Sequence, residues 1–232
     1  MLFDVITIFP ELIAPYLNGS MLGRAQKNDL VSFKLHNLRN WTSDVHHSVD
    51  DTPYGGGAGM VMKIEPLYLA LQDLTKDKKT KKQKIILLSA KGQTWNQKLA
   101  QKYSKLDRLI LICGRYEGVD ERITNFIDEE ISIGDYVLTG GEIGALAIVD
   151  SITRLLPGVL GNAESIKYES HATTGVLEHP QYTRPEVFEA AGKKMRVPKV
   201  LLSGDHKKIA EWRKTKSKCK NQNVKWQFKM QN

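Results

Sequence analysis

Three short segments of almost wholly apolar residues place the strongest limit on how this chain can fold. They span residues 2–9 (LFDVITIF), 85–88 (IILL) and 109–112 (LILI), and segments of helical character separate them. Strands whose hydrophobicity is continuous rather than alternating are typical of a parallel sheet that helices cover on both faces. The sequence therefore predicts an α/β fold built on a parallel sheet.

Weaker patterns complete the predicted order of elements. Helices are expected at residues 11–28, 65–74, 95–105, 142–156 and 206–216. Further strands are expected at 31–38, near 130–133 and at 200–202. A turn at 89–92 is expected to end the strand at 85–88. The acidic residues 128–130 are expected at a solvated strand edge.

The chain carries its positive charge mainly towards its C-terminus. Residues 193–232 contain 13 Lys and Arg against 2 Asp and Glu, so the totals of 34 and 26 leave 21 against 24 for residues 1–192. A basic appendage on a mildly acidic body is typical of a protein that meets a polyanion. A solvated tail is the alternative, and charge alone does not separate the two. The lysine-rich run at 76–84 is expected to be a surface loop, with a phosphate contact as the alternative.

The two cysteines, Cys113 and Cys219, have no CxxC spacing. Neither a disulfide framework nor a zinc site is expected, and a reducing, cytoplasmic location fits this pattern. The N-terminal residues indicate a strand rather than a signal peptide, because no basic segment precedes the apolar run. No apolar run approaches the roughly 18–20 residues of a membrane span, so no membrane partner is expected.

Glycine-rich loops indicate a site for a small molecule. The chain has neither a P-loop nor a G-x-G-x-x-G turn, which argues against an NTPase or an ordinary dehydrogenase. Three loops, at 55–59, 114–118 and 134–141, would still let a ligand approach the backbone closely, and two of them follow buried strands. Ligands of α/β proteins bind at that edge of the sheet, although such glycines can also serve tight turns alone.

One loop is crowded with polar side chains, Asp44, His46, His47, Asp50 and Asp51. Their spacing matches no familiar set of metal ligands. A polar loop that makes hydrogen bonds or contacts a substrate is the favoured interpretation, and no metal site is predicted.

Five longer segments carry the pattern of a known family. They are 49–60 (VDDTPYGGGAGM), 113–122 (CGRYEGVDER), 132–142 (SIGDYVLTGGE), 154–161 (RLLPGVLG) and 180–186 (PQYTRPE). In this order and at this spacing they resemble the bacterial tRNA (guanine-N1)-methyltransferases, the TrmD family. The resemblance spans residues 1–215.

The resemblance implies a SPOUT-type methyltransferase domain whose parallel sheet contains a deep trefoil knot near residues 85–141. General folding rules would not predict such a knot. The resemblance divides the chain into the methyltransferase domain at 1–160, an interdomain linker at 161–184 and a small, basic, mostly helical C-terminal domain at 185–232 that binds tRNA. It also implies a homodimer with shared active sites, and the helix at 142–156 is expected to contribute to that interface.

The implied reaction is methylation of N1 of guanosine at position 37 of tRNA, next to the anticodon, with S-adenosylmethionine as the methyl donor. Mg2+ is left open as a second cofactor. The residues at the cofactor-binding positions are Leu88, Ser89, Ala90, Gly114, Tyr116, Glu117, Gly118, Ile133, Gly134, Asp135, Tyr136, Val137, Leu138, Gly140 and Gly141. The residues at the positions that hold the target guanine are His47, Asp50, Tyr54, Gly55, Gly59 and Met60.

Guanine N1 must lose a proton before methylation, so the site needs a carboxylate base and a donor near O6. By resemblance Arg154 serves O6. The family's base is an aspartate, commonly within Asp-Ser-Phe, and at the matching place this chain reads YESH (168–171), which makes Glu169 the predicted base. Glutamate has a similar intrinsic pKa, about 4.3 against 3.9. Thr52 and Ala58 also depart from the family, which often has Arg and Pro there.

Two other functions stay open on the sequence. A non-catalytic RNA-binding protein on the same scaffold would explain the replaced aspartate, but not the intact cofactor loops. A SPOUT enzyme that modifies a ribose hydroxyl or rRNA would keep those loops, but Arg154 and the segment 180–186 favour guanine. A methyl-transfer assay with mass mapping of the product separates these functions.

Overall fold

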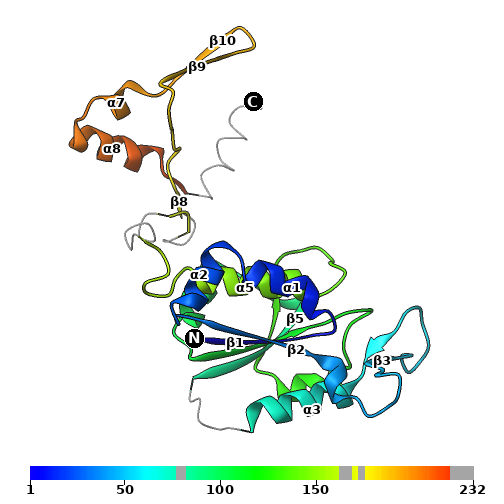
Figure 1. Cartoon of the computed structure of the whole chain (residues 1–232). Coiled ribbons are helices and arrows are strands. Elements are labelled where there is room, and N and C mark those ends of the chain that lie inside the picture. Colours follow the sequence, from blue (N-terminus) through cyan, green and yellow to red (C-terminus); the bar gives the residue numbers. More distant parts are fainter. Residues whose placement is uncertain (77–81, 162–168, 172–175, 220–232) are drawn as a thin grey trace. The chain divides into compact units, whose positions relative to one another are not determined.

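The computed structural model describes residues 1–76, 82–161, 169–171 and 176–219 (Figure 1). Most of the lysine-rich run at 76–84, part of the predicted linker and residues 220–232 therefore lie outside the described residues. The chain forms two compact units, Met1–Gly161 and Asn162–Asn232, and each has its own arrangement of elements.

A five-stranded parallel sheet forms the centre of the first unit. Its strands are β1 (Leu2–Thr7), β2 (Ser32–Asn37), β5 (Gln83–Thr94), β6 (Arg108–Cys113) and β7 (Glu129–Ser132), in the order β2-β1-β6-β5-β7. Each neighbouring pair is parallel, with Val5 opposite Leu111 and Leu87 opposite Ile112. The predicted α/β fold with a parallel sheet is confirmed.

Helices cover both faces of this sheet (Figure 1). The layer on one face contains α1 (Pro10–Leu17), α2 (Ser20–Lys27), α4 (Gln97–Tyr103) and α5 (Glu142–Thr153). The layer on the other face contains α3 (Ile64–Thr75) and the 3-10 helices η1 (Leu38–Trp41) and η2 (Glu121–Phe126). Alternate residues of a strand join opposite layers: Leu111 packs with the α5 layer, and Ile112 with the α3 layer. This double burial is why the strands are continuously apolar.

The predicted turn at 89–92 is wrong, because β5 continues to Thr94. Strand β7 pairs with β5 on both sides of a bulge between Leu88 and Gln93. Gly92 permits this close pairing, since a Cβ there would lie 2.4 Å from the main-chain carbonyl carbon of Glu130. The second half of β5 is polar and largely exposed, so its sequence carries no strand signal.

The acidic residues 128–130 lie at an edge of the sheet, as expected, because β7 is its last strand and Asp128 is exposed. Two of them also make specific bonds. Asp128 accepts a hydrogen bond from the backbone N–H of Ile85 at 2.7 Å. Glu129 pairs with Lys84 Nζ at 3.0 Å and accepts a hydrogen bond from the hydroxyl of Tyr103. Burial by itself raises the pKa of Glu129, but these two partners outweigh it and hold the pKa below its usual value. The acidic residues therefore tie β7 to β5 and α4.

Two helices replace the single helix expected at 11–28. α1 ends at Leu17, its C-cap Asn18 still donates its backbone N–H to the carbonyl of Ala14, and α2 begins at Ser20. Gly23 lets α2 pack against this break, since a Cβ there would lie 2.3 Å from the carbonyl oxygen of Asn18. Between η1 and α3, the short strands β3 (Asp50–Asp51) and β4 (Val61–Met62) form an antiparallel pair.

The second unit contains both helices and strands in its described residues. β8 (Val176–Leu177) pairs with β11 (Lys218–Cys219), and β9 (Val187–Ala190) forms a hairpin with β10 (Lys193–Arg196). The helix expected at 206–216 is confirmed as α8 (His206–Lys216), with Asp205 as its N-cap. The strand expected at 200–202 is wrong, because these residues form the short helix α7 (Lys199–Leu202) that begins after Pro198. A run of three apolar residues is too short for its period to be read, and a proline favours a helix start. Among the described helices of the chain, none has the length and hydropathy to cross a membrane.

Candidate active site

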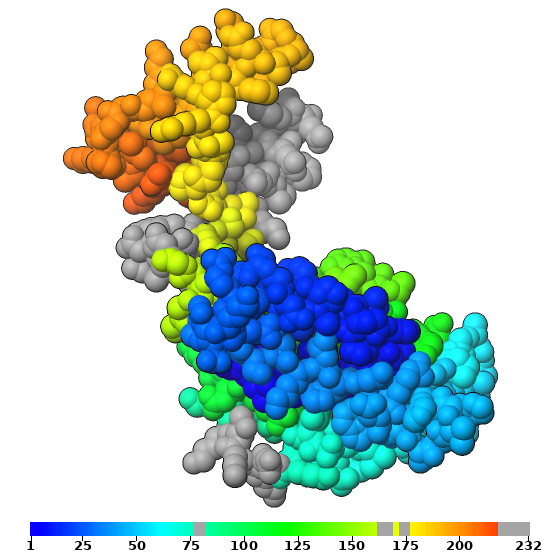
Figure 2. All heavy atoms as spheres, viewed as in Figure 1, coloured from blue at the N-terminus to red at the C-terminus, as the bar shows by residue number. Residues whose placement is uncertain are grey.

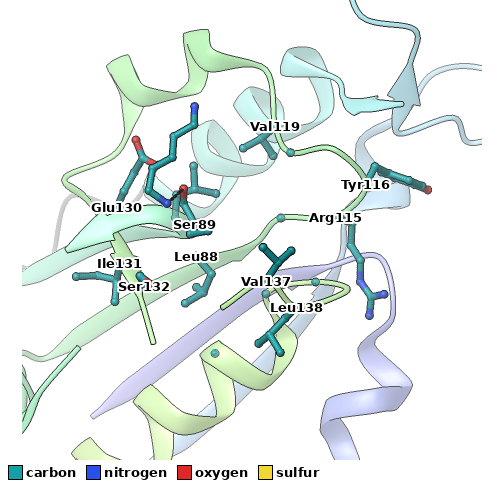
Figure 3. Close-up of a pocket in the computed structure, with 18 of the residues that line it drawn as sticks. Leu88, Ser89, Arg115, Tyr116, Val119, Glu130, Ile131, Ser132, Val137 and Leu138 are labelled. Carbon is teal, nitrogen blue, oxygen red and sulfur yellow. Dashed lines mark hydrogen bonds between the residues drawn. The ribbon is translucent and has the colours of Figure 1, made fainter. Parts of the chain in front are cut away.

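A pocket of about 260 Å³ lies beside the middle of β5 and the carboxyl ends of β6 and β7 (Figure 3). This volume is near the lower end of the roughly 300–1,000 Å³ of small-molecule sites. The lining consists of residues 87–91, 114–121, 123–124, 130–134 and 136–141, together with Gly144. The pocket thus occupies the edge of the sheet where parallel strands commonly present ligands.

Two lining segments, 114–118 and 134–141, lie directly against each other. The backbone N–H of Gly141 donates to the carbonyl of Gly114 at 2.9 Å, and Arg115 forms a β-bridge with Gly140. A Cβ on Gly141 would lie 2.8 Å from Cys113 Cα. That is well inside the roughly 3.5–4.0 Å at which carbon atoms pack, so this approach requires glycine.

The structure brings fourteen of the fifteen predicted cofactor residues together around this pocket. The exception is Asp135, an exposed residue between Gly134 and Tyr136 that does not belong to the lining. Figure 3 shows Leu88, Val137 and Leu138 beside one another, which provides an apolar wall. Glu117 supplies a carboxylate on the lining.

Several lining residues are absent from the predicted set, including Arg115, Thr139, Lys91, Glu121 and Thr124. The first two lie inside predicted loops, and treating those loops as continuous segments would have found them. The others reach the pocket because β5 is longer than predicted and because η2 follows the 114–118 loop. Lys91 Nζ bonds to Glu121 Oε2 at 3.1 Å, but both side chains are about three-quarters exposed, so this pair contributes little.

Three of the predicted guanine-contacting residues adjoin the pocket. Glu117 donates its backbone N–H to the carbonyl of Met60 at 3.0 Å, and a Cβ on Gly59 would lie 2.5 Å from Glu117 Cγ.

Tyr116 has a left-handed backbone with φ of 60°, and its side chain points away from Val137 and Leu138 (Figure 3). Burial and the carboxylate of Asp50 raise the pKa of this tyrosine, while Arg39 lowers it. Asp50 and Arg39 therefore lie beside the Tyr116 hydroxyl.

The other three predicted guanine-contacting residues are exposed and lie outside the pocket lining. His47 contacts the hydroxyl of Thr42 through Nδ1 at 3.0 Å, and its carbonyl accepts from Arg39 at 3.0 Å. Tyr54 and Gly55 lie within residues 50–60, cyan in Figure 2, which reach the surface of the first unit. The structure thus places Asp50, Gly59 and Met60 beside the pocket, and His47, Tyr54 and Gly55 on exposed surface outside its lining.

The two predicted catalytic residues lie in different units of the chain. Arg154 follows the last turn of α5 in the first unit, where it is half-buried and its backbone N–H bonds to the carbonyl of Asp150 at 3.1 Å. Glu169 belongs to the second unit and is half-buried. Their catalytic roles remain predictions.

A buried cysteine, Cys113, directly precedes the pocket loop at 114–118 and does not belong to the pocket lining. Burial raises the pKa of the Cys113 thiol well above its usual value. This residue therefore stays a thiol at neutral pH and is a poor nucleophile. No three His, Cys, Asp or Glu side chains of the described part of the chain are grouped to hold a metal ion. In the polar loop, Asp44 instead accepts hydrogen bonds from the backbone N–H of Ser48 at 3.0 and 3.1 Å.

Comparisons with known proteins agree on one family. Residues 1–230 match the family model described as tRNA (Guanine-1)-methyltransferase TrmD. A protein of Dictyoglomus turgidum named tRNA (guanine-N(1)-)-methyltransferase is 53% identical over 211 residues, covering 91% of this chain and 82% of the relative. Relatives of the same name from Dehalococcoides mccartyi and Lactobacillus johnsonii are 49% and 52% identical, covering 94% and 92% of this chain and 86% and 84% of the relatives.

Proposed function

Because this chain belongs to the tRNA (guanine-1)-methyltransferase family, TrmD, we propose that it methylates N1 of guanosine at position 37 of tRNA, with S-adenosylmethionine as the donor. Family membership supports the general reaction, methyl transfer to guanine N1 of tRNA. The donor, the position in the tRNA and the catalytic residues are the proposed parts. One observation supports the proposed donor most strongly: the pocket that the 114–118 and 134–141 loops help to line.

The pocket fits S-adenosylmethionine in three respects. Gly114, Gly140 and Gly141 have no side chains, so a flat ring and a ribose can approach the backbone of the pocket loops closely. Leu88 and Leu138 give an apolar wall, and Glu117 gives a carboxylate that can face a cation. S-adenosylmethionine would supply a methyl group on a sulfonium, which is already activated for transfer. The protein's own task is therefore to prepare the acceptor nitrogen.

Two residues would prepare guanine N1. The carboxylate of Glu169 would accept the N1 proton, which makes the nitrogen nucleophilic. The guanidinium of Arg154 would donate to O6, where negative charge builds up as that proton leaves. Asp50, Gly59 and Met60 would help to hold the guanine, because they adjoin the pocket at Tyr116 and Glu117.

The order of strands supports the proposed knot. β6 and β7 lie on opposite sides of β5, so the chain crosses β5 between them. It then returns, because α5 packs against β6 and β1. A chain that crosses and returns around one strand follows the path that a trefoil knot near 85–141 requires.

Surface features support the proposed partners, tRNA and a second copy of the chain. α8 carries exposed Lys and Arg side chains that can contact phosphates. Leu12 and Tyr16 of α1 and Ile143 of α5 expose 56%, 51% and 60% of their surface, and the Tyr16 hydroxyl donates to Asp150 of α5 at 2.6 Å. This apolar face is our proposed site of homodimer contact.

The proposal is tested with purified full-length protein, labelled S-adenosylmethionine and tRNA transcripts that carry guanosine at positions 36 and 37. We expect label in the tRNA, and mass mapping should identify N1-methylguanosine at position 37. Label on a ribose, or at another nucleotide, would refute the proposed acceptor.

Glu169→Gln tests the proposed base. The amide cannot accept the N1 proton, so turnover should fall about 100-fold or more, while S-adenosylmethionine binding measured by calorimetry stays unchanged. Glu178→Gln is a matched control on the same unit. Full turnover by Glu169→Gln would exclude this residue as the base.

A further inference from the structure

A buried carboxylate lies behind the pocket loops, at the first residue of α5. Glu142 is 4% exposed and is the first helical residue after Gly141. Its Oε1 accepts a hydrogen bond from the hydroxyl of Thr7 at 2.7 Å, and both of its oxygens lie near Arg115 Nε, at 3.0 and 3.2 Å. Thr7 ends β1 and is fully buried. One carboxylate thus joins β1, α5 and the 114–118 loop.

The start of α5 is a favourable place for the carboxylate of Glu142. The first turn of a helix presents unpaired N–H groups and the positive end of the helix dipole, which favour a carboxylate. Gly141, the N-cap, has no side chain to provide that stabilisation. A bond from a charged guanidinium to a carboxylate is stronger than one between neutral groups. The carboxylate is therefore firmly anchored, and the segments bound to it are anchored too.

Arg115 connects this anchor to both pocket loops. It lies within the 114–118 loop and forms a β-bridge with Gly140 of the 134–141 loop. A Cβ on Gly140 would lie 2.2 Å from Arg115 Nε and 2.5 Å from Glu142 Oε2. The ion pair therefore lies in the space where the two loops touch.

The Arg115 side chain points out of the pocket rather than into it. Figure 3 shows its guanidinium lying beyond the loop that carries Val137 and Leu138. The guanidinium carbon lies 4.8 Å from the centre of the Phe9 ring, and the Thr7 hydroxyl also accepts from the backbone N–H of Phe9 at 3.0 Å. The N-terminal segment after β1 thus forms one side of the same network.

We infer that Glu142 is a positioning residue that holds the two pocket loops at the separation the ligand needs, through Arg115 and Thr7. The inference rests on the proposed binding of S-adenosylmethionine in this pocket. Glu142 acts through the backbone of other residues and touches no reacting atom. Its loss should weaken cofactor binding and raise KM for the cofactor, with a smaller effect on kcat at saturation.

Two variants test the network, each with a matched control. Glu142→Gln keeps the shape and an acceptor for Thr7, but it loses the charge that Arg115 requires. Thr7→Val keeps the shape and loses the hydroxyl, whereas Thr7→Ser retains it. Asp4→Asn is the control for stability, since it removes a buried carboxylate that pairs with His36 and Arg108 outside the pocket.

Two measurements are made on the full chain. Calorimetry gives the dissociation constant of S-adenosylmethionine, and we expect it to rise about 10-fold or more in Glu142→Gln and Thr7→Val, as for a lost bond to a charged group. Thr7→Ser and Asp4→Asn should bind about as the wild type does. Hydrogen exchange of the ligand-free chain should show faster exchange at Gly141 N–H, which bonds to Gly114, in the first two variants alone.

The outcomes separate this inference from the proposed function. Wild-type affinity and wild-type exchange in Glu142→Gln would overturn the inference and leave the proposed function intact. So would an equal loss of affinity in Asp4→Asn, because general destabilisation would then explain both. If the wild type binds no S-adenosylmethionine, the proposed function fails and the cofactor role of Glu142 fails with it.

Discussion

Replacing Gly141 by alanine tests whether the contact between the two pocket loops is as tight as the structure indicates. The new Cβ would lie 2.8 Å from Cys113 Cα and 2.9 Å from Leu88 Cβ. Carbon atoms pack at about 3.5–4.0 Å, so the loops would have to separate by roughly 1 Å. Neither neighbour can move aside by rotating a side chain, because Cα and Cβ atoms are fixed to the main chain.

The expected loss of stability and of ligand affinity in Gly141→Ala follows from the size of this overlap. Overpacking of a close contact typically costs about 1–3 kcal/mol. In a unit the size of Met1–Gly161, each kcal/mol lowers Tm by about 2–4 °C, so we expect a loss of about 2–12 °C. If the same free energy is lost from the ligand-binding arrangement, at about 1.4 kcal/mol per tenfold change, the affinity for S-adenosylmethionine falls about 5- to 150-fold.

Differential scanning calorimetry measures the Tm, and titration calorimetry measures the affinity for S-adenosylmethionine. Gly161→Ala is the matched control, since a Cβ at Gly161 meets nothing within 4 Å. We expect this control to keep both the Tm and the affinity of the wild type. A Gly141→Ala chain with the wild-type Tm and affinity would show that the loops accommodate a methyl group and that their contact is not tight.

Two further predictions concern stability and tRNA binding. Asp4 is buried and accepts hydrogen bonds from His36 Nε2 and Arg108 Nε, each at 2.7 Å. Burial raises the pKa of Asp4, but these partners outweigh it and hold the pKa below its usual 3.8. Asp4→Asn should therefore cost about 3–5 kcal/mol at neutral pH. The difference should shrink as pH falls below 3.8, where the wild type loses its carboxylate; urea unfolding at several pH values checks this, and a constant difference would contradict it. In α8, changing the exposed Lys207, Arg213 and Lys214 to alanine should flatten the salt dependence of tRNA binding, by about 0.7–0.9 in log–log slope for each lost phosphate contact. Filter binding over a salt series measures the slope, and an unchanged slope would argue against α8 as the contact.

The sequence alone determined the class of fold and two of the glycine-rich segments that line the pocket. Residues 109–112 are wholly apolar because both helical layers contact β6, and that double burial is visible in a single strand. Gly140 and Gly141 were visible because close approach leaves no room for a Cβ there, and Gly118 because its φ of 133° disfavours other residues. Such local patterns depend on which residue types a position tolerates. They can therefore be read from the sequence without knowing which residues contact that position.

Tertiary structure alone decided the features that depend on partners distant in the chain. The polar half of β5 becomes a strand only because β7 pairs with it across the bulge at Leu88 and Gln93. Glu142 resembles an ordinary acidic residue at a helix start, until the sheet order brings to it Thr7, 135 positions away, and Arg115, 27 positions away. Propensity and hydrophobic period describe a residue and its near neighbours. A buried ion pair depends on the charge that faces it, and only the folded chain determines which charge that is.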